Sequence, residues 1–323
     1  MKRAYVVGVD AYDRDPLKGC VSDACNVAEL LRANANGSPN FDVSLETSIV
    51  RKSELRDGVR KLFAEGEDIE TALFYFSGHG TFMDGNGYLV LPDVYETGDG
   101  LPMRDVLELA NGSAVKNKII ILDCCGAGAI SVAGNYSMQP YVQRGVTILA
   151  ACKEKEKAVE CASAGLFSSL LCEALRGGAA GVCGMVTPGN VYAFIDRSLG
   201  PWCPRPVFVS HVTSFVSIRE CAPKVPLEIL RRLPELFPSD GYEYKLDPSF
   251  EDTNTVDSRI TPIEPYAKRE NVAVFKELQK LQSVGIVEPV DAAFMYFAAM
   301  ESKSCRLTAL GVHYMHLARD RRI

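Results

Sequence analysis

The chain has 323 residues, of which 47% are hydrophobic, and a formal net charge of −6 at pH 7. The negative balance excludes proteins that bind nucleic acid or anionic membranes through overall positive charge. The 11 cysteines are scattered and include no C-x-x-C pair, which argues against a disulfide scaffold, a zinc ribbon or a redox dithiol. The apolar run at 4–9 is too short for a signal peptide, and no segment reaches the roughly 18 apolar residues of a membrane span. We therefore expect a cytoplasmic protein with free thiols and no membrane partner.

Apolar strands alternate with amphipathic helices through the first two hundred residues. Continuous apolar runs predict strands over 4–10, 70–78, 116–125, 145–153 and 205–210. Apolar residues at helical spacing predict helices over 22–35, 52–65, 166–175 and 187–199. This alternation predicts an α/β fold with a mostly parallel sheet that helices cover on both faces.

The amino-acid composition of the sequence changes after residue 220. Residues 221–262 are rich in Pro, Asp and Glu and predict a linker between a domain at 1–220 and a second domain at 263–323. The second domain is predicted as a small α+β unit in the order helix, strand, strand, turn, helix, with 294–300 as its second strand and the last helix starting near Thr308. Its segment CRLTALG resembles the end of a winged-helix wing as it enters the last helix.

The charge of the second domain bears on its partner. Residues 263–323 carry nine Lys or Arg against seven Asp or Glu, and nucleic-acid binders concentrate more basic charge than that. We therefore expect a regulatory protein partner rather than DNA for this domain.

Two predicted strands end on residues that could carry catalysis. SGHG (77–80) lies at the end of one, and DCCGAG (123–128) begins at the end of another. The carboxyl ends of parallel strands meet at one edge of a sheet, where sites form. A thiol is mostly protonated at neutral pH and needs a base such as imidazole to become a nucleophile. On the residues alone, a Cys–His dyad and a turn histidine beside two packed thiols are equally favoured.

Four motifs in one order, however, resemble the caspase and metacaspase clan of cysteine peptidases over residues 3–210. They are AYVVGVDAY (4–12), LKGCVSDA (17–24), the pair SGHG (77–80) and DCCGAG (123–128), and ILAACKEKEKAVECASAGLFSSLLCEAL (148–175). The resemblance implies a caspase-like six-stranded sheet flanked by helices, and a cysteine endopeptidase that works through an acyl-enzyme.

The resemblance also assigns roles to residues. In the clan's D-x-C pattern the second residue after the acid is the nucleophile, here Cys125, and His79 is the general base and then the general acid. The backbone N–H groups of Gly80 and Cys125 are the implied donors to the oxyanion. Gly126 begins a G-A-G loop that replaces the clan's usual H-S-G.

Metacaspases resemble one another in an acidic S1 pocket, which binds the side chain before the cleaved bond (the P1 residue). Its implied members here are Cys20, Asp23, Ser77 and Asp123. Such a pocket implies cleavage after basic residues, with Arg preferred over Lys because a planar guanidinium can bind a carboxylate through two nitrogens. On the residues alone, Asp23 is better explained as a helix N-terminal acid, and a strand-end cap is the alternative explanation for Asp123.

The resemblance raises three further expectations. Arg144 is the single basic residue between the nucleophile strand and the next strand, a common processing site in caspase-like folds, so we expect cleavage after it. Many metacaspases respond to calcium, but residues 83–93 lack the spaced carboxylates of an EF-hand loop, and the sequence predicts no cofactor or metal. Bacterial members of this kind imply a role in stress or antiviral defence.

A second function remains open from the sequence. The chain could be a catalytically inactive caspase-like scaffold, or a DNA-associated regulator that acts through residues 263–323. The departure at Gly126 favours this alternative, and the presence of His79, Cys125 and the acidic pocket residues together disfavours it.

Overall fold

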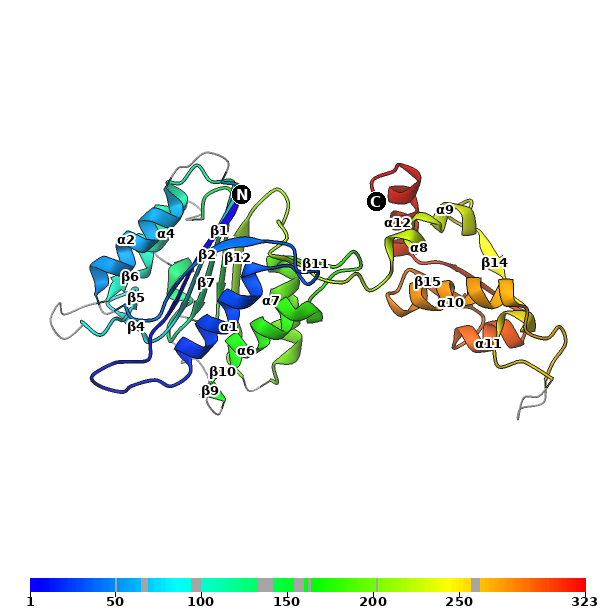
Figure 1. Ribbon diagram of the computed structural model, residues 1–323, viewed down its shortest axis with the longest axis horizontal. Helices are drawn as coiled ribbons and strands as arrows, with labels where there is room; N and C mark the ends of the chain where they lie inside the picture. Colours follow the sequence, from blue (N-terminus) through cyan, green and yellow to red (C-terminus); the bar gives the residue numbers. More distant parts are fainter. Residues whose placement is uncertain are drawn as a thin grey trace. The chain divides into compact units, whose positions relative to one another are not determined.

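The structure is a computed structural model that describes residues 1–49, 51–64, 69–93, 100–132, 142–153, 160–161, 164–201, 203–256 and 262–323. The chain forms two compact units, Met1–Ala222 and Pro223–Ile323 (Figure 1). Among the described residues, every helix is too short or too polar to cross a membrane.

A six-stranded sheet forms the centre of the first unit. Its strand order is β12-β8-β7-β3-β1-β2, and β12 alone runs antiparallel to its neighbour. The strands are β1 (Lys2–Gly8), β2 (Phe41–Glu46), β3 (Thr71–Ser77), β7 (Asn117–Asp123), β8 (Val146–Ala150) and β12 (Val207–His211). Every residue of β3 is buried, as expected for a strand covered on both faces. The predicted α/β fold with a mostly parallel sheet is confirmed.

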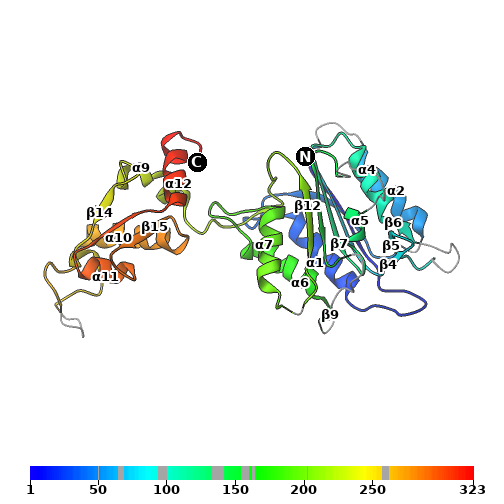
Figure 2. The same cartoon turned by 180° about the vertical axis from the view of Figure 1, so that it is seen from behind.

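Helices cover both faces of this sheet. Figures 1 and 2, drawn from opposite sides, both place α1 (Cys20–Arg32), α6 (Leu166–Glu173) and α7 (Pro188–Ser198) on one face. The other face carries α2 (Lys52–Phe63) and α4 (Met103–Asn111). Side chains alternate along each strand, so the sheet separates two buried apolar clusters.

Several short elements extend the first unit beyond the predicted ones. A second, antiparallel sheet consists of β4 (Gly80–Met83), β5 (Asn86–Leu89) and β6 (Leu101–Pro102). The other short elements are α5 (Ala129–Val132), the β9 (Glu160–Cys161) and β10 (Ala164–Gly165) pair, a π-helical turn at Ala174–Gly178, and the β11 (Met185–Val186) and β13 (Arg219–Glu220) pair. The sequence analysis missed β2 and α4, although the buried residues of α4 do recur at helical spacing.

The second unit is a small α+β domain that begins at Pro223, so the expectation of a linker over 221–262 is wrong. The segment 223–256 contains α8 (Leu227–Arg231), α9 (Leu233–Leu236), β14 (Glu243–Lys245) and a 3₁₀ turn at Pro248–Phe250. β14 pairs with β16 (Ser304–Leu307) from the end of the chain. The segment also buries Leu230 and Phe237 completely. Prolines and acids between these apolar residues gave the segment the composition of a linker.

The remainder of the unit differs from the predicted order at two places. It contains α10 (Arg269–Ser283), β15 (Val287–Val290), α11 (Met295–Met300), then β16, which the predicted order lacks, and α12 (Ala309–Arg319). The predicted strand at 294–300 is wrong, because this segment is the helix α11, which buries Met295, Ala298 and Ala299 at helical spacing. An apolar run this short does not distinguish a strand from a buried helix.

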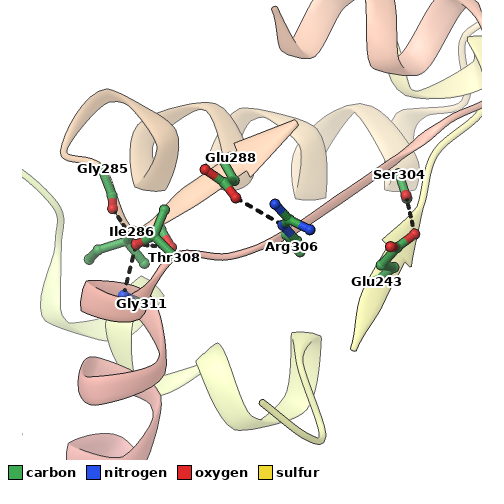
Figure 3. A network of polar contacts seen from close by, with 8 residues as sticks. All are labelled: Glu243, Gly285, Ile286, Glu288, Ser304, Arg306, Thr308 and Gly311. Carbon is green, nitrogen blue, oxygen red and sulfur yellow. Dashed lines mark hydrogen bonds and ion pairs between the residues drawn. The ribbon is translucent and has the colours of Figure 1, made fainter. Parts of the chain in front are cut away.

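Polar contacts fix the strands and the start of the last helix in this unit (Figure 3). Arg306 of β16 pairs with Glu288 of β15 at 2.8 Å. On the other side, Ser304 donates a hydrogen bond to Glu243 at 2.6 Å. The Thr308 hydroxyl accepts from the Gly311 N–H at 3.1 Å, so α12 begins directly after Thr308 as predicted.

Candidate active site

The adjacent cysteines at the end of β7 lie in different environments. Cys124 is 1% exposed, and burial, reinforced by nearby Cys152, raises its thiol pKa well above the ordinary value. Cys125 is partly exposed. Gly126 follows with a φ of 64°, a left-handed conformation that glycine adopts without strain. Of the two thiols, only that of Cys125 is therefore in reach of a substrate.

The loop that carries His79 packs directly against the cysteine pair. It leaves the sheet after Ser77 of β3, the strand next to β7. A Cβ added at Gly80 would collide with the Cys125 carbonyl oxygen and would lie 2.9 Å from the Cys124 sulfur. Only a residue without a Cβ fits here, so Gly80 allows the His79 loop to lie directly against the loop of Cys124 and Cys125. The structure thus brings the predicted residues His79, Gly80 and Cys125 to one edge of the sheet.

Tyr12 holds the His79 backbone and was missed in the sequence analysis. The His79 N–H donates to the Tyr12 hydroxyl at 2.9 Å, and that hydroxyl donates to the Val90 carbonyl at 3.0 Å. The Val90 N–H in turn donates to the His79 carbonyl at 2.9 Å. In a regular antiparallel ladder, His79 and Val90 would exchange two direct hydrogen bonds. Here one of the two is direct, and the Tyr12 hydroxyl bridges the groups of the other. Its ring also contacts the imidazole, with ring centroids 4.5 Å apart.

The imidazole of His79 has a defined partner on one nitrogen. Its Nε2 lies 2.6 Å from the Asp15 carbonyl oxygen. A carbonyl can only accept, so Nε2 must carry a proton, and in the neutral ring Nδ1 is then the nitrogen that can accept one. The sequence contains no signal for a backbone partner of this kind.

Two buried acids meet at the start of α6. Asp23 of α1 is 3% exposed and Asp123 at the end of β7 is 6% exposed. Both face Gly165, because a Cβ added there would lie 2.6 Å from Asp123 Oδ2 and 3.3 Å from Asp23 Oδ2. The Gly165 N–H donates to Asp23 Oδ2 at 3.0 Å, and the Ser168 hydroxyl donates to Asp123 Oδ2 at 2.5 Å.

The other two predicted pocket residues lie beside these acids. Burial raises the thiol pKa of Cys20 to about 12, against the effect of a hydrogen bond with Ser77, and nearby Asp10, Asp123 and Asp23 raise it further. Asp10 also accepts from the Cys20 N–H at 2.9 Å. All four residues expected for the S1 pocket are therefore gathered in one acidic cluster.

Arg144 lies away from this cluster. It precedes β8, whereas His79 and Cys125 follow the carboxyl ends of strands parallel to β8. The Arg144 carbonyl accepts from Lys118 Nζ at 3.0 Å, and the Gly145 N–H donates to the His211 carbonyl at 2.7 Å. The Arg144–Gly145 bond is thus at the opposite edge of the sheet and is held on both sides.

Among the residues that the structure describes, no group of three or more His, Cys, Asp or Glu side chains is placed to hold a metal ion. Trp202, which the sequence predicts to pack the loop before the last strand of the sheet, lies outside the described residues.

Comparison with known proteins agrees with this geometry. The family model of the caspase domain matches residues 1–192, and the chain therefore belongs to the caspase domain family. The expected caspase-like fold is confirmed. Members of this family are generally cysteine peptidases, so the domain indicates a cysteine peptidase-type function with protein substrates.

Two solved structures are each similar to about two thirds of this chain. One is the protein GSU0716 from Geobacter sulfurreducens, with 16% identity, a TM-score of 0.49, and coverage of 69% of this chain and 97% of that one. The other is caspase-1 from Spodoptera frugiperda, with 16% identity, a TM-score of 0.46, and coverage of 68% and 90%. No curated protein matches the chain.

Proposed function

We propose that this protein is a metacaspase-type cysteine endopeptidase that cleaves proteins after Arg and, less efficiently, after Lys. The observation that carries the proposal is the pair of buried acids, Asp23 and Asp123, at the same edge of the sheet as Cys125 and His79. Two carboxylates close together repel one another unless a cation lies near them. They would also repel an aspartate at P1, so this pocket disfavours cleavage after acidic residues.

The proposed mechanism uses the two ring nitrogens of His79 differently. Nε2 stays on the Asp15 carbonyl, and Nδ1 takes the proton from the Cys125 thiol. The thiolate attacks the carbonyl carbon of the scissile bond, and the tetrahedral intermediate collapses to a thioester as His79 returns the proton to the leaving amine. Water then attacks the thioester, with His79 again as base.

Backbone N–H groups of Gly80 and Cys125 are the proposed donors to the oxyanion. The β4–β5 ladder supports the assignment for Gly80. Hydrogen-bonded and non-hydrogen-bonded pairs alternate along an antiparallel ladder, and the pair of His79 with Val90 is a hydrogen-bonded one. Gly80 and Leu89 form the next pair, so the ladder does not use the Gly80 N–H.

Residues 263–323, expected to resemble a winged helix, are proposed to contact a regulatory protein. Phe297 of α11 and Phe294, the residue that precedes this helix, are exposed, which suits a protein partner. Arg306 lies between Glu288 and Glu243 on the sheet, so this row of side chains does not form the basic surface that nucleic acid requires. A cytoplasmic location and a role in stress or antiviral defence remain predictions.

The Arg144–Gly145 bond is proposed to be cleaved by another molecule, either a second copy of this protein or a different protease. The bond lies at the edge of the sheet opposite the site, so a chain cannot cut itself there without unfolding this segment. The hydrogen bonds from Lys118 and to His211 must also break first. Activation by calcium or by a partner protein is also part of the proposal, and turnover with and without calcium tests the first of these.

The test compares fluorogenic peptides ending in Arg, Lys or Asp, with and without calcium, for wild type and Cys125→Ala. We expect Arg-selective turnover that the substitution abolishes, and a new N-terminus at Gly145 by mass spectrometry of the incubated protein. Asp-selective turnover would contradict the acidic pocket. No turnover under any condition, together with no labelling of Cys125 by a peptidyl-arginine ketone, would favour the inactive scaffold.

A further inference from the structure

A buried chain of hydroxyl groups leads to one of the two pocket acids. Ser168 is completely buried and donates from Oγ to Asp123 Oδ2 at 2.5 Å. The Tyr75 hydroxyl, also completely buried, lies 2.6 Å from Ser168 Oγ. Because the Ser168 proton is directed to the carboxylate, Tyr75 must be the donor to Ser168. Burial raises the pKa of Tyr75 well above its ordinary value, so its proton stays in place for this bond.

The second acid is held by the same end of the same helix. Gly165 precedes the first residue of α6, and its N–H donates to Asp23 Oδ2 at 3.0 Å. Ser168 is the third residue of the helix. Both acids thus lie at the N-terminus of α6, where unpaired N–H groups and the helix dipole favour negative charge. This arrangement offsets the repulsion between two buried carboxylates before a substrate arrives.

Packing alone does not explain a serine at position 168. Its neighbours on the buried face of α6 are Phe167, Leu171 and Cys172, and a hydroxyl among apolar side chains costs free energy unless it is hydrogen-bonded. Ser168 Oγ makes its hydrogen bonds to Asp123 on one side and to Tyr75 on the other, so its hydroxyl links the pocket acid to the buried tyrosine.

We propose that Ser168, supported by Tyr75, is a positioning residue for substrate specificity that keeps Asp123 oriented and charged for a guanidinium or ammonium group. The proposal rests on the proposed basic-residue peptidase, whose S1 pocket it completes. Without the Ser168 hydroxyl, Asp123 loses a donor and remains close to Asp23. The repulsion then favours protonation of one acid, and the pocket loses the charge that attracts a cation.

The test measures binding rather than turnover, with agmatine as a guanidinium probe titrated into the full-length Cys125→Ala protein. We expect Ser168→Ala to weaken agmatine binding about 10- to 100-fold, as expected for the loss of a hydrogen bond to a charged group. Ser168→Thr keeps the hydroxyl and should bind within about threefold of the parent, since the change is small. Ser169→Ala, at an exposed position on the same helix, is the matched control.

Two further measurements separate this role from a purely structural one. The pH below which agmatine binding is lost should rise in Ser168→Ala, because Asp123 beside Asp23 is easier to protonate without the Ser168 donor. Tyr75→Phe removes the donor to Ser168 but keeps the ring, and should weaken binding less than Ser168→Ala does.

The outcomes distinguish this proposal from the proposed function. Agmatine binding by Ser168→Ala equal to that of the parent would overturn the role of Ser168, whatever the peptidase does. Agmatine binding that depends on Ser168, together with a Cys125-containing protein that neither hydrolyses the Arg peptide nor is labelled by the peptidyl-arginine ketone, would support the role and refute the peptidase. A parent protein that does not bind agmatine would overturn the role of Ser168 and the acidic pocket, and turnover of the Arg peptide would decide separately whether the chain is a peptidase.

Discussion

Tyr12→Phe removes one oxygen atom at the point where the His79 loop is fixed. The lost hydroxyl accepts from the His79 N–H and donates to the Val90 carbonyl. Burial raises the pKa of Tyr12 far above its ordinary value, so the hydroxyl is a reliable donor in the wild type. The ring of phenylalanine can keep the contact with the imidazole, so the substitution tests only the two hydrogen bonds by which the Tyr12 hydroxyl joins His79 to Val90.

The expected magnitude follows from the two hydrogen bonds. Each is worth about 1 kcal/mol net, and about 1–3 kcal/mol if the partner is left buried and unsatisfied. We therefore expect the free energy of unfolding to fall by about 2 kcal/mol. A displaced His79 costs rate but does not touch the S1 pocket, so kcat should fall about tenfold with little change in KM.

Urea unfolding and steady-state hydrolysis of an Arg peptide measure the two effects. Tyr88→Phe is the matched control, because Tyr88 lies in β5 of the same small sheet and its hydroxyl makes no hydrogen bond to any described residue. Wild-type kcat and stability in Tyr12→Phe would refute the bridging role. A raised KM at constant kcat would instead mean that Tyr12 contacts the substrate.

Two other predictions concern the thiols. Cys124→Ala should lower the free energy of unfolding by about 1 kcal/mol through the small cavity it leaves but keep turnover, and iodoacetamide should modify Cys125 rather than Cys124 in the wild type. A Cys124 adduct in peptide mapping would contradict the assignment of the nucleophile. Stability should also fall as the pH rises above about 9. Burial raises the pKa of Cys20 to about 12 and that of Cys172 to about 11 from 9.0. The unfolded chain then loses protons that the folded chain keeps, which costs up to about 1.4 kcal/mol per pH unit for each thiol. Urea midpoints between pH 8 and 10.5 should show a smaller decline for Cys172→Ala, and an equal decline would refute this explanation.

The sequence predicted the elements whose signal is local. A strand buried on both faces is mostly apolar, so the central residues of β3, β7 and β8 were recognisable as continuous apolar runs. Their order along the chain placed the SGHG and DCCGAG motifs at the same edge of a parallel sheet. The clan resemblance then named Cys125, since local pattern alone did not separate it from Cys124.

Local pattern failed where pairing partners are far apart in the chain. The Pro- and acid-rich composition of 221–262 predicted a linker, but the strand β14 in this segment pairs with β16, near the end of the chain. The run at 294–300 is short enough to suit either a strand or a helix, and the burial of Met295, Ala298 and Ala299 decided for the helix.

The contacts that shape the candidate site were decided by tertiary structure alone. Tyr12 and His79 are 67 residues apart, and Tyr75 and Ser168 are 93 apart. No periodicity relates such residues, because their hydrogen bonds exist only after the sheet has assembled and the helices have packed on it. The sequence determined which side chains are available for chemistry, and packing determined which thiol is accessible, which imidazole nitrogen can accept a proton and what holds each acid in place.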